Sequence, residues 1–213
     1  DAPAATNICR QGEDVRRGDV VLSRGVVLGA AHVAVLATEG RAVVPVARRP
    51  RVAVLATGDE LVPVEAEPGP GQIRNSNGPQ LAAQAAAAGA SVRLLPPVSD
   101  RPEALREALA AALAESDVVV LSGGVSTGDF DLVPPAMRAC GLEIRFDSVA
   151  MKPGRPTTFA TGEGAWCFGL PGNPVSSYLQ FELLVRPLLA ALMGADPSPR
   201  PFAAPLAAAV TRR

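Results

Sequence analysis

The 213-residue sequence contains one histidine, three cysteines and a single lysine. The histidine, His32, lies in an alanine-rich stretch, which argues against a Ser-His-Asp triad or a histidine-ligated zinc site. The cysteines are far apart, form no CxxC pair and are odd in number, which is typical of a reduced, cytosolic protein. Neither GxxxxGKS/T nor GxGxxG occurs, so the standard nucleotide-binding loops are excluded.

An excess of either charge is also missing. Lys and Arg number 20 and Asp and Glu 21, which gives a net charge of −1 and no general attraction to nucleic acid or anionic lipid. The longest apolar stretch, 175–193, contains Glu182, Arg186 and Pro187, and we expect it to be too polar to span a bilayer. Hydrophobic residues make up 48% of the chain, which is enough for a sizeable buried core.

The basic residues that are present are almost all arginine, and Lys152 is the only lysine. An ammonium group and a guanidinium group bind anions with different geometry. Two explanations for this lysine are therefore open: a position that needs a compact ammonium group, or chance.

Composition divides the chain into three regions. Residues 1–49 have too little apolar surface for a core of their own, and residues 30–38 predict a short helix in this appendage. Residues 50–195 alternate short apolar runs with helical patterns. Residues 196–213 are proline-rich and predict a linker, and because the chain starts at Asp1, we expect it to be a piece of a longer protein.

The alternation in residues 50–195 predicts a doubly wound α/β domain with a mostly parallel sheet. Asp100 and Glu103 predict a capping box at the start of one helix. Strands are expected at 52–56, 92–95, 117–121 and 144–149, with a hairpin formed by 157–160 and 166–170. Helices are expected at 81–88, in the segment that follows Asp100, at 133–140 and at 174–193.

Ligands bind outside the carboxyl ends of the strands in such a sheet, and the first polar cluster there is 57–60 (TGDE). The adjacent carboxylates of Asp59 and Glu60 cannot both be buried without a cation. Alternatively, Asp59 is a helix N-cap.

The second cluster, 122–131 (SGGVSTGDFD), follows another expected strand. Its glycines allow backbone N–H groups to approach a phosphate closely. Asp129 and Asp131 could join the first cluster as oxygen ligands of Mg²⁺, which takes one or two carboxylates together with substrate phosphates. An ordinary turn uses the same residue types.

Two further clusters suit an anion. In 151–156 (MKPGRP), a type II turn would hold Lys152 and Arg155 close together, either around an anion or as a solvated basic turn. In 169–177 (GLPGNPVSS), Asn173 can cap a helix whose first N–H groups and serine hydroxyls form an oxyanion site, although helix capping alone would explain this pattern.

These four motifs, in this order, closely resemble the MoeA family of molybdopterin molybdenumtransferases, related to the gephyrin E domain. The resemblance extends from about residue 7 to 194 and includes 12–19 (GEDVRRGD), which is similar to the family's lead-in to its catalytic domain. It implies a three-layer α/β/α fold like that of MogA and MoaB. The appendage would then be part of the family's first domains, and residues 196–213 a linker into a missing C-terminal β domain.

The resemblance also implies a function. Family members insert molybdenum from molybdate into adenylylated molybdopterin with loss of AMP, use Mg²⁺, and are cytoplasmic homodimers supplied by an adenylyltransferase. The acidic residues around metal and substrate would be Asp59, Glu60, Asp100 and Asp131, with Asp59, Glu60 and Asp131 as metal ligands. The predicted substrate- and anion-binding residues are Ser122, Gly123, Gly124, Ser126, Lys152, Arg155, Pro171, Gly172, Asn173 and Ser176.

Arg155 departs from the family, which often has lysine at this position. A piece that lacks the family's other domains would bind ligand yet turn over poorly. Two other functions remain open: a molybdopterin adenylyltransferase of the MogA or MoaB type, which shares the fold and glycine loop, and a non-catalytic scaffold module.

Overall fold

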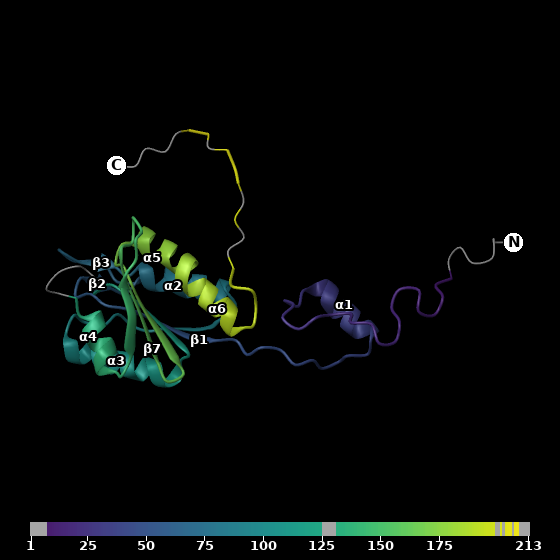
Figure 1. Cartoon of the computed structure of the whole chain (residues 1–213). Helices are drawn as coiled ribbons and strands as arrows, with labels where there is room; N and C mark the ends of the chain where they lie inside the picture. Colours follow the sequence, from purple (N-terminus) through teal and green to yellow (C-terminus); the bar gives the residue numbers. More distant parts are fainter. Residues whose placement is uncertain (1–7, 125–130, 199–200, 202, 206, 209–213) are drawn as a thin grey trace. The chain divides into compact units, whose positions relative to one another are not determined.

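The computed structural model describes residues 8–124, 131–198, 201, 203–205 and 207–208. The chain forms two units, an N-terminal unit (Asp1–Ala47) and a sheet domain (Arg48–Arg213) (Figure 1).

The N-terminal unit contains one helix, α1 (Ala30–Thr38), among its described residues. None of the residues in α1 is buried, and Val20, Val27 and Val43 of the same unit are more than 70% exposed. The Gly29 N–H donates a hydrogen bond to Nδ1 of His32 at 3.0 Å, so the single histidine closes the first turn of this helix. His32 therefore has a local structural role.

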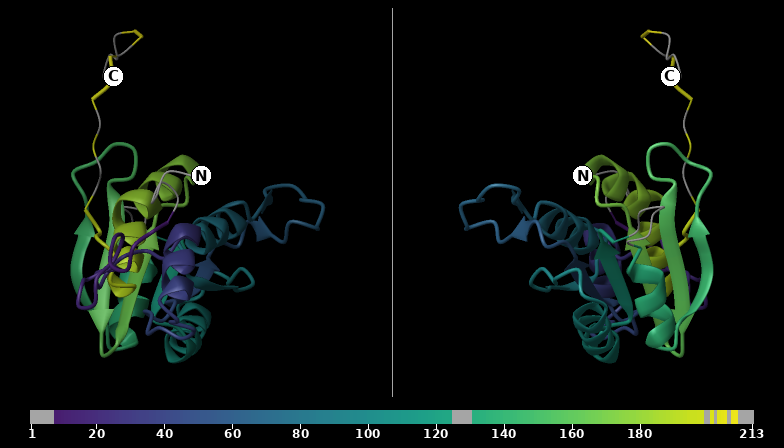
Figure 2. Two further views of the ribbon diagram at one scale, coloured as in Figure 1. Left: turned by 90° about the vertical axis from the view of Figure 1, so that its right-hand side faces the viewer. Right: turned by 90° about the vertical axis from the view of Figure 1, so that its left-hand side faces the viewer.

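The sheet domain is built on six strands in the order β4-β1-β5-β8-β7-β6. Four neighbouring strands are parallel: β4 (Ser91–Leu94), β1 (Arg51–Ala56), β5 (Val118–Ser122) and β8 (Ala165–Leu170). The last two, β7 (Pro156–Gly162) and β6 (Glu143–Ser148), form antiparallel pairs beyond β8. A separate parallel pair, β2 (Leu61–Val62) and β3 (Ile73–Arg74), projects with its connecting loop from the domain (Figure 2).

Helices cover both faces of this sheet (Figure 1). On one face lie α2 (Asn77–Ala87) and the continuous helix made of α5 (Pro174–Gln180), the π-helical turn η1 (Phe181–Val185) and α6 (Arg186–Leu192). On the other lie α3 (Pro102–Glu115) and α4 (Val133–Ala139). The predicted doubly wound, three-layer α/β fold is therefore confirmed.

Strand periodicity explains how one sheet forms two cores. In β1, Val52 and Val54 pack with α2 and the helix that starts at Pro174, whereas Ala53 and Leu55 pack with α3 and α4. Successive strand side chains point to opposite faces, and a strand covered on both faces is therefore apolar throughout.

By length and composition alone, the helix Pro174–Leu192 is apolar enough to cross a membrane, contrary to the expectation that this stretch is too polar, and a third of it is buried. Its buried side chains Phe181, Val185 and Leu189 pack against the sheet, as expected for a core helix of this fold. Pro187 has no N–H to continue the α-helical hydrogen bonds, and it lies two residues after the end of the π-helical turn.

The predicted capping box is wrong. The N-cap of α3 is Arg101, and no side chain caps this helix end. The Asp100 carboxylate bonds instead to residues that follow β1, because a partner distant in sequence outcompetes the helix terminus.

Candidate active site

The carboxyl ends of β1, β5 and β8 meet at one edge of the sheet, here called the carboxyl edge. The Thr57 N–H donates to the Ser122 carbonyl at 3.0 Å, and the Gly123 N–H donates to the Leu170 carbonyl at 3.2 Å. Parallel pairing thus continues into the loops, and it brings together segments that lie more than 40 residues apart.

Three carboxylates form an acidic group at this edge: Asp59 and Glu60 follow β1, and Asp100 lies between β4 and α3. Asp100 accepts a hydrogen bond from the Thr57 hydroxyl at 2.6 Å, and its own N–H donates to Oδ1 of Asp59 at 3.1 Å. The Glu60 carboxylate folds over Gly58, where an added Cβ would lie 2.5 Å from Oε2. Within the described residues none of the three carboxylates forms an ion pair, so the group carries uncompensated negative charge.

The structure also decides the alternative role of Asp59. Asp59 precedes the short strand β2 and lies at no helix start, so it is not an N-cap.

The glycine loop after β5 lies so close to Thr57, in the segment after β1, that no side chain would fit between them. Gly123 has a φ of 94°, and an added Cβ would lie 2.4 Å from the Thr57 carbonyl oxygen. Gly124 has a φ of 63°, and its carbonyl accepts the Val133 N–H at 3.3 Å. Ser126, a predicted anion-binding residue, and Asp129 lie outside the described residues.

Asp131 is half-buried just before α4. Its Oδ1 is buried without a hydrogen-bond partner. Burial raises the pKa of the Asp131 carboxyl and the charge of Asp147 adds to this, whereas the Val133 N–H opposes it. The described part of the chain contains no cluster of three His, Cys, Asp or Glu residues that could hold a metal. Joint ligation by Asp59, Glu60 and Asp131 therefore stays a prediction.

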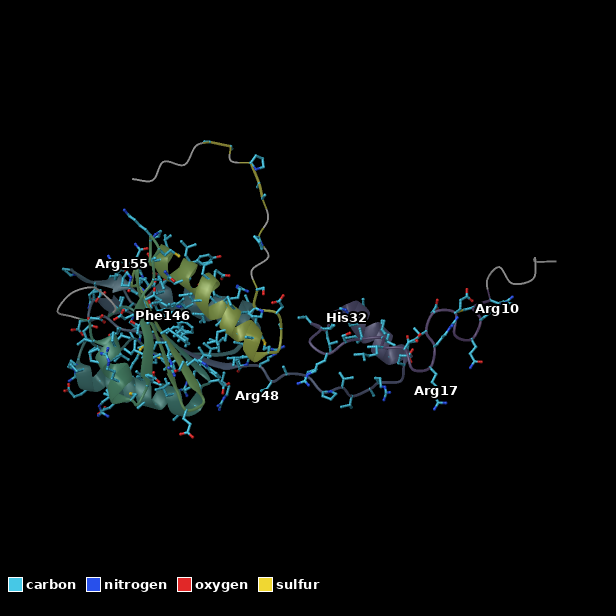
Figure 3. All side chains as sticks on the ribbon, in the orientation of Figure 1. Arg10, Arg17, His32, Arg48, Phe146 and Arg155 are labelled. Atoms are coloured by element: carbon cyan, nitrogen blue, oxygen red, sulfur yellow. The ribbon has the colours of Figure 1, made fainter. Side chains whose placement is uncertain are left out.

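The predicted basic turn, residues 152–155, is here called the cationic turn. Lys152 and Arg155 are exposed at its two ends, and Gly154 between them is buried with a φ of 104°. The Lys152–Pro153 peptide bond is cis. The turn leads into β7, which is antiparallel to β8, so it lies at the carboxyl edge, where Arg155 is seen in Figure 3.

The helix that starts at Pro174 begins at the same edge, and Asn173 is its N-cap as predicted. The Asn173 Oδ1 accepts the N–H groups of Val175 and Ser176 at 3.0 and 3.2 Å. These two donors are therefore occupied, contrary to the expectation that they are free for an oxyanion. The buried Ser176 hydroxyl lies 3.5 Å from the same oxygen.

Asn77 bonds to two of these segments and was not identified from the sequence. Its Nδ2 donates to the Ser122 hydroxyl and to the Gly172 carbonyl, both at 2.7 Å, while its Oδ1 is buried without a partner. The Ser122 hydroxyl in turn donates to the Pro171 carbonyl at 3.4 Å. The polar Asn-Ser-Asn run at 75–77, where α2 begins, is the signal that would have marked this position.

Two cavities lie away from these groups. One, of about 610 Å³, is lined by residues of α4 and β6 and by the segment that joins them. The other, of about 700 Å³, lies within the N-terminal unit. Neither lining includes a predicted site residue.

A three-layer α/β domain that gathers carboxylates, a close-approach glycine loop and a cationic turn at one strand edge belongs to the class of ligand-binding domains suited to anionic ligands. Residues 53–191 match the family model described as a probable molybdopterin binding domain, and the chain belongs to this family.

Relatives agree with this assignment. The chain is 47% identical over 189 residues to the molybdopterin molybdenumtransferase of Staphylococcus epidermidis and 42% identical to that of Staphylococcus aureus, covering 89% of this chain and 45% of each relative. It thus spans about half the length of these curated relatives. The resemblance drawn from the four motifs is confirmed.

Solved structures give the same result. A molybdopterin biosynthesis MoeA protein from Pyrococcus horikoshii superposes with a TM-score of 0.75 at 33% identity, over 87% of this chain and 46% of that chain. A tungsten cofactor synthesizing protein MoaB from Pyrococcus furiosus has a TM-score of 0.52 at 17% identity, over 70% and 98% of the two chains. The second likeness shows a shared fold alone.

Proposed function

We propose that the complete protein inserts molybdenum from molybdate into adenylylated molybdopterin and releases AMP, as the name of its curated relatives indicates. One structural observation carries the proposal: the acidic group, the glycine loop, the cationic turn and Ser176 all lie at the carboxyl edge. A negative ligand with a metal-neutralised phosphoanhydride needs both kinds of charge in one place.

The cationic turn and the helix start would hold the molybdate. Lys152 and Arg155 supply two positive charges for a tetrahedral dianion, and the Ser176 hydroxyl supplies a donor from the helix. Because the Val175 and Ser176 N–H groups already bond to Asn173, the side chains contribute most of the anion's hydrogen bonds. Arg155 can bind two oxygens of the anion in parallel, whereas Lys152 acts as a point charge.

The acidic group would supply one or two carboxylates to Mg²⁺, since no three described His, Cys, Asp or Glu residues lie together so that they could hold the ion by themselves. Asp59, Glu60 and Asp100 are not neutralised by any described cation, and the buried Oδ1 of Asp131 has no hydrogen-bond partner. Mg²⁺ is normally held by one or two carboxylates and completed by substrate phosphates and water, so a full protein cage is not needed. When bound, Mg²⁺ would neutralise charge on the leaving phosphate.

The glycine loop would position the anionic groups of the substrate. Gly123 and Gly124 leave their backbone accessible because neither carries a side chain, and Asn77 holds the neighbouring Ser122 and Gly172 in place. Catalysis by these groups consists of positioning and electrostatic stabilisation, and no protein nucleophile takes part.

The setting of the complete protein is part of the same proposal. We expect a cytoplasmic homodimer that receives adenylylated molybdopterin from an adenylyltransferase and binds neither nucleic acid nor membrane. The near-neutral charge balance supports the absence of a nucleic-acid partner.

The test is incubation of the purified complete protein with adenylylated molybdopterin, molybdate and Mg²⁺ while AMP is measured. AMP release that requires molybdate supports the proposal. Formation of the adenylylated compound from ATP and molybdopterin would instead identify an adenylyltransferase. Binding without either reaction would identify a non-catalytic module.

A further inference from the structure

Gln180 is a buried amide that the proposed chemistry does not use. It lies in α5 with only 1% of its surface exposed. Its Nε2 donates a hydrogen bond to the Gly154 carbonyl at 2.7 Å, across 26 residues of sequence. A buried glutamine that bonds to one backbone oxygen fixes the position of that backbone.

The oxygen that Gln180 binds belongs to the cationic turn. Gly154 lies between Lys152 and Arg155, and its carbonyl also accepts the hydroxyl of the fully buried Thr157 at 3.0 Å. Two buried donors therefore hold this carbonyl, one from the helix and one from β7. The fit is close, since a Cβ on Gly154 would lie 2.5 Å from Nε2 of Gln180.

The same helix face carries Ser176. Residues four apart in a helix are neighbours on one face, so Ser176 and Gln180 point in the same direction from consecutive turns. Gln180 thus links the cationic turn to the helix that presents Ser176.

We propose that Gln180 is a positioning residue that sets the distance between the cationic turn and Ser176, and thereby the affinity for a tetrahedral oxyanion. It touches no substrate and acts through the Gly154 carbonyl. The identity of the anion as molybdate rests on the proposed function, whereas the link between Gln180 and the turn does not.

The test compares Gln180→Met with Gln84→Met in the complete protein. Methionine keeps the length of glutamine without its amide donors. Gln84 is a matched control because it is also buried, at 7% exposure, and donates to the Tyr178 carbonyl and to Glu182 on the same long helix, away from the turn.

Lys152 provides a direct readout because it is the only lysine in the chain. Labelling the complete protein with ¹³Cε-lysine gives an NMR signal for Lys152, which is identified by its loss from the spectrum of Lys152→Arg. We expect Gln180→Met to shift and broaden that signal, and Gln84→Met to leave it unchanged.

The same signal, followed during titration with sodium molybdate, gives the affinity. Losing a buried hydrogen bond that fixes the turn should raise the molybdate Kd about tenfold in Gln180→Met. In the AMP-release assay, the KM for molybdate should rise by the same factor while kcat at saturation changes less than twofold. Gln84→Met should keep both constants within twofold of the unmodified protein.

An unchanged Lys152 signal in Gln180→Met would overturn the inference. If that variant does not fold, Gln180→Glu replaces the Nε2 donor with a carboxylate oxygen at nearly the same position, and an unchanged signal there has the same meaning. A perturbed Lys152 signal with no AMP release from the unmodified protein would leave the inference standing and reject the proposed function.

Discussion

The carboxylates at the two edges of the sheet differ in whether an arginine neutralises them. At the amino edge, Asp117 precedes β5 and accepts hydrogen bonds from the guanidinium groups of Arg48 and Arg51 at 2.6 and 3.1 Å, and from the Arg51 N–H at 2.7 Å. At the carboxyl edge, the acidic group has no such partner among the described residues. The carboxylate at the amino edge is neutralised within the chain, whereas those at the carboxyl edge keep their charge available for the cation that we propose.

The pKa of Asp117 is consistent with this neutralisation by two arginines. The hydrogen bond and charge of Arg48, with the bonds from Arg51, hold the pKa of Asp117 well below its usual range despite the opposing effect of burial. The edge therefore contributes to stability at neutral pH and does not require a ligand.

The largest expected effect follows from removing charge at the carboxyl edge. Lys152→Ala or Asp59→Asn in the complete protein should lower molybdate-dependent AMP release by about 10²–10³-fold. Lys152 would bind the anion directly, and Asp59 would help to hold the Mg²⁺ that neutralises charge on the leaving phosphate. Far-UV circular dichroism should remain unchanged, since both side chains are exposed.

Arg145→Ala is the control for that experiment. Arg145 is an exposed cation on β6 that pairs with Glu143, outside the proposed site. Its loss should leave AMP release unchanged, and near-normal release in both Lys152→Ala and Asp59→Asn would reject the site assignment.

Gly123→Ala tests the close approach of the two loops at the carboxyl edge. The added Cβ would meet the Thr57 carbonyl at 2.4 Å in a left-handed backbone conformation. We expect the free energy of unfolding to fall by about 3 kcal/mol in urea titrations. Gly141→Ala is matched in backbone conformation, with a φ of 79° and no atom within 4 Å, and should lose only about 1 kcal/mol. An equal loss of unfolding free energy in the two variants would show that Gly123 and Thr57 are not in close contact.

Asp117→Asn probes the opposite edge. Because both arginines remain more than half exposed, we expect a loss of only about 1–2 kcal/mol at pH 7. A lowered pKa contributes stability above the unfolded value of about 3.9, and that contribution is lost as the pH falls through the folded value. The difference between the two proteins should therefore shrink below about pH 4, and a difference independent of pH would contradict the account.

Asn173→Ala has the smallest expected effect. It removes the cap from the helix that starts at Pro174 and should lower the free energy of unfolding by about 1 kcal/mol in urea titrations. The variant also leaves the Val175 and Ser176 N–H groups without their Oδ1 acceptor. If the cap does not contribute, the unfolding curves will coincide.

Most of the fold could be predicted from local pattern. The apolar runs at β1 and β5 are buried on both faces, and Gly89 after α2 and Gly123 after β5 mark where these elements end. The four motifs were expected at one edge because the carboxyl ends of parallel strands meet there, and the structure places their described residues at that edge.

Residues whose partners are distant in sequence were missed or misinterpreted. Asp100 was read as a local helix cap, but it bonds to Thr57, 43 residues away. Asn77 bonds to Gly172, 95 residues away, and Gln180 to Gly154. In sequence, each of these residues resembles an ordinary residue in or near a helix. Its hydrogen-bond partner is known only once the folded chain brings the two segments together.

Anomalous X-ray scattering at the molybdenum edge, from crystals of the complete protein soaked with molybdate, tests the convergence of these groups most directly. The account predicts one strong peak in contact with the side chains of Lys152, Arg155 and Ser176. A peak elsewhere on the protein, with this position vacant, would contradict it.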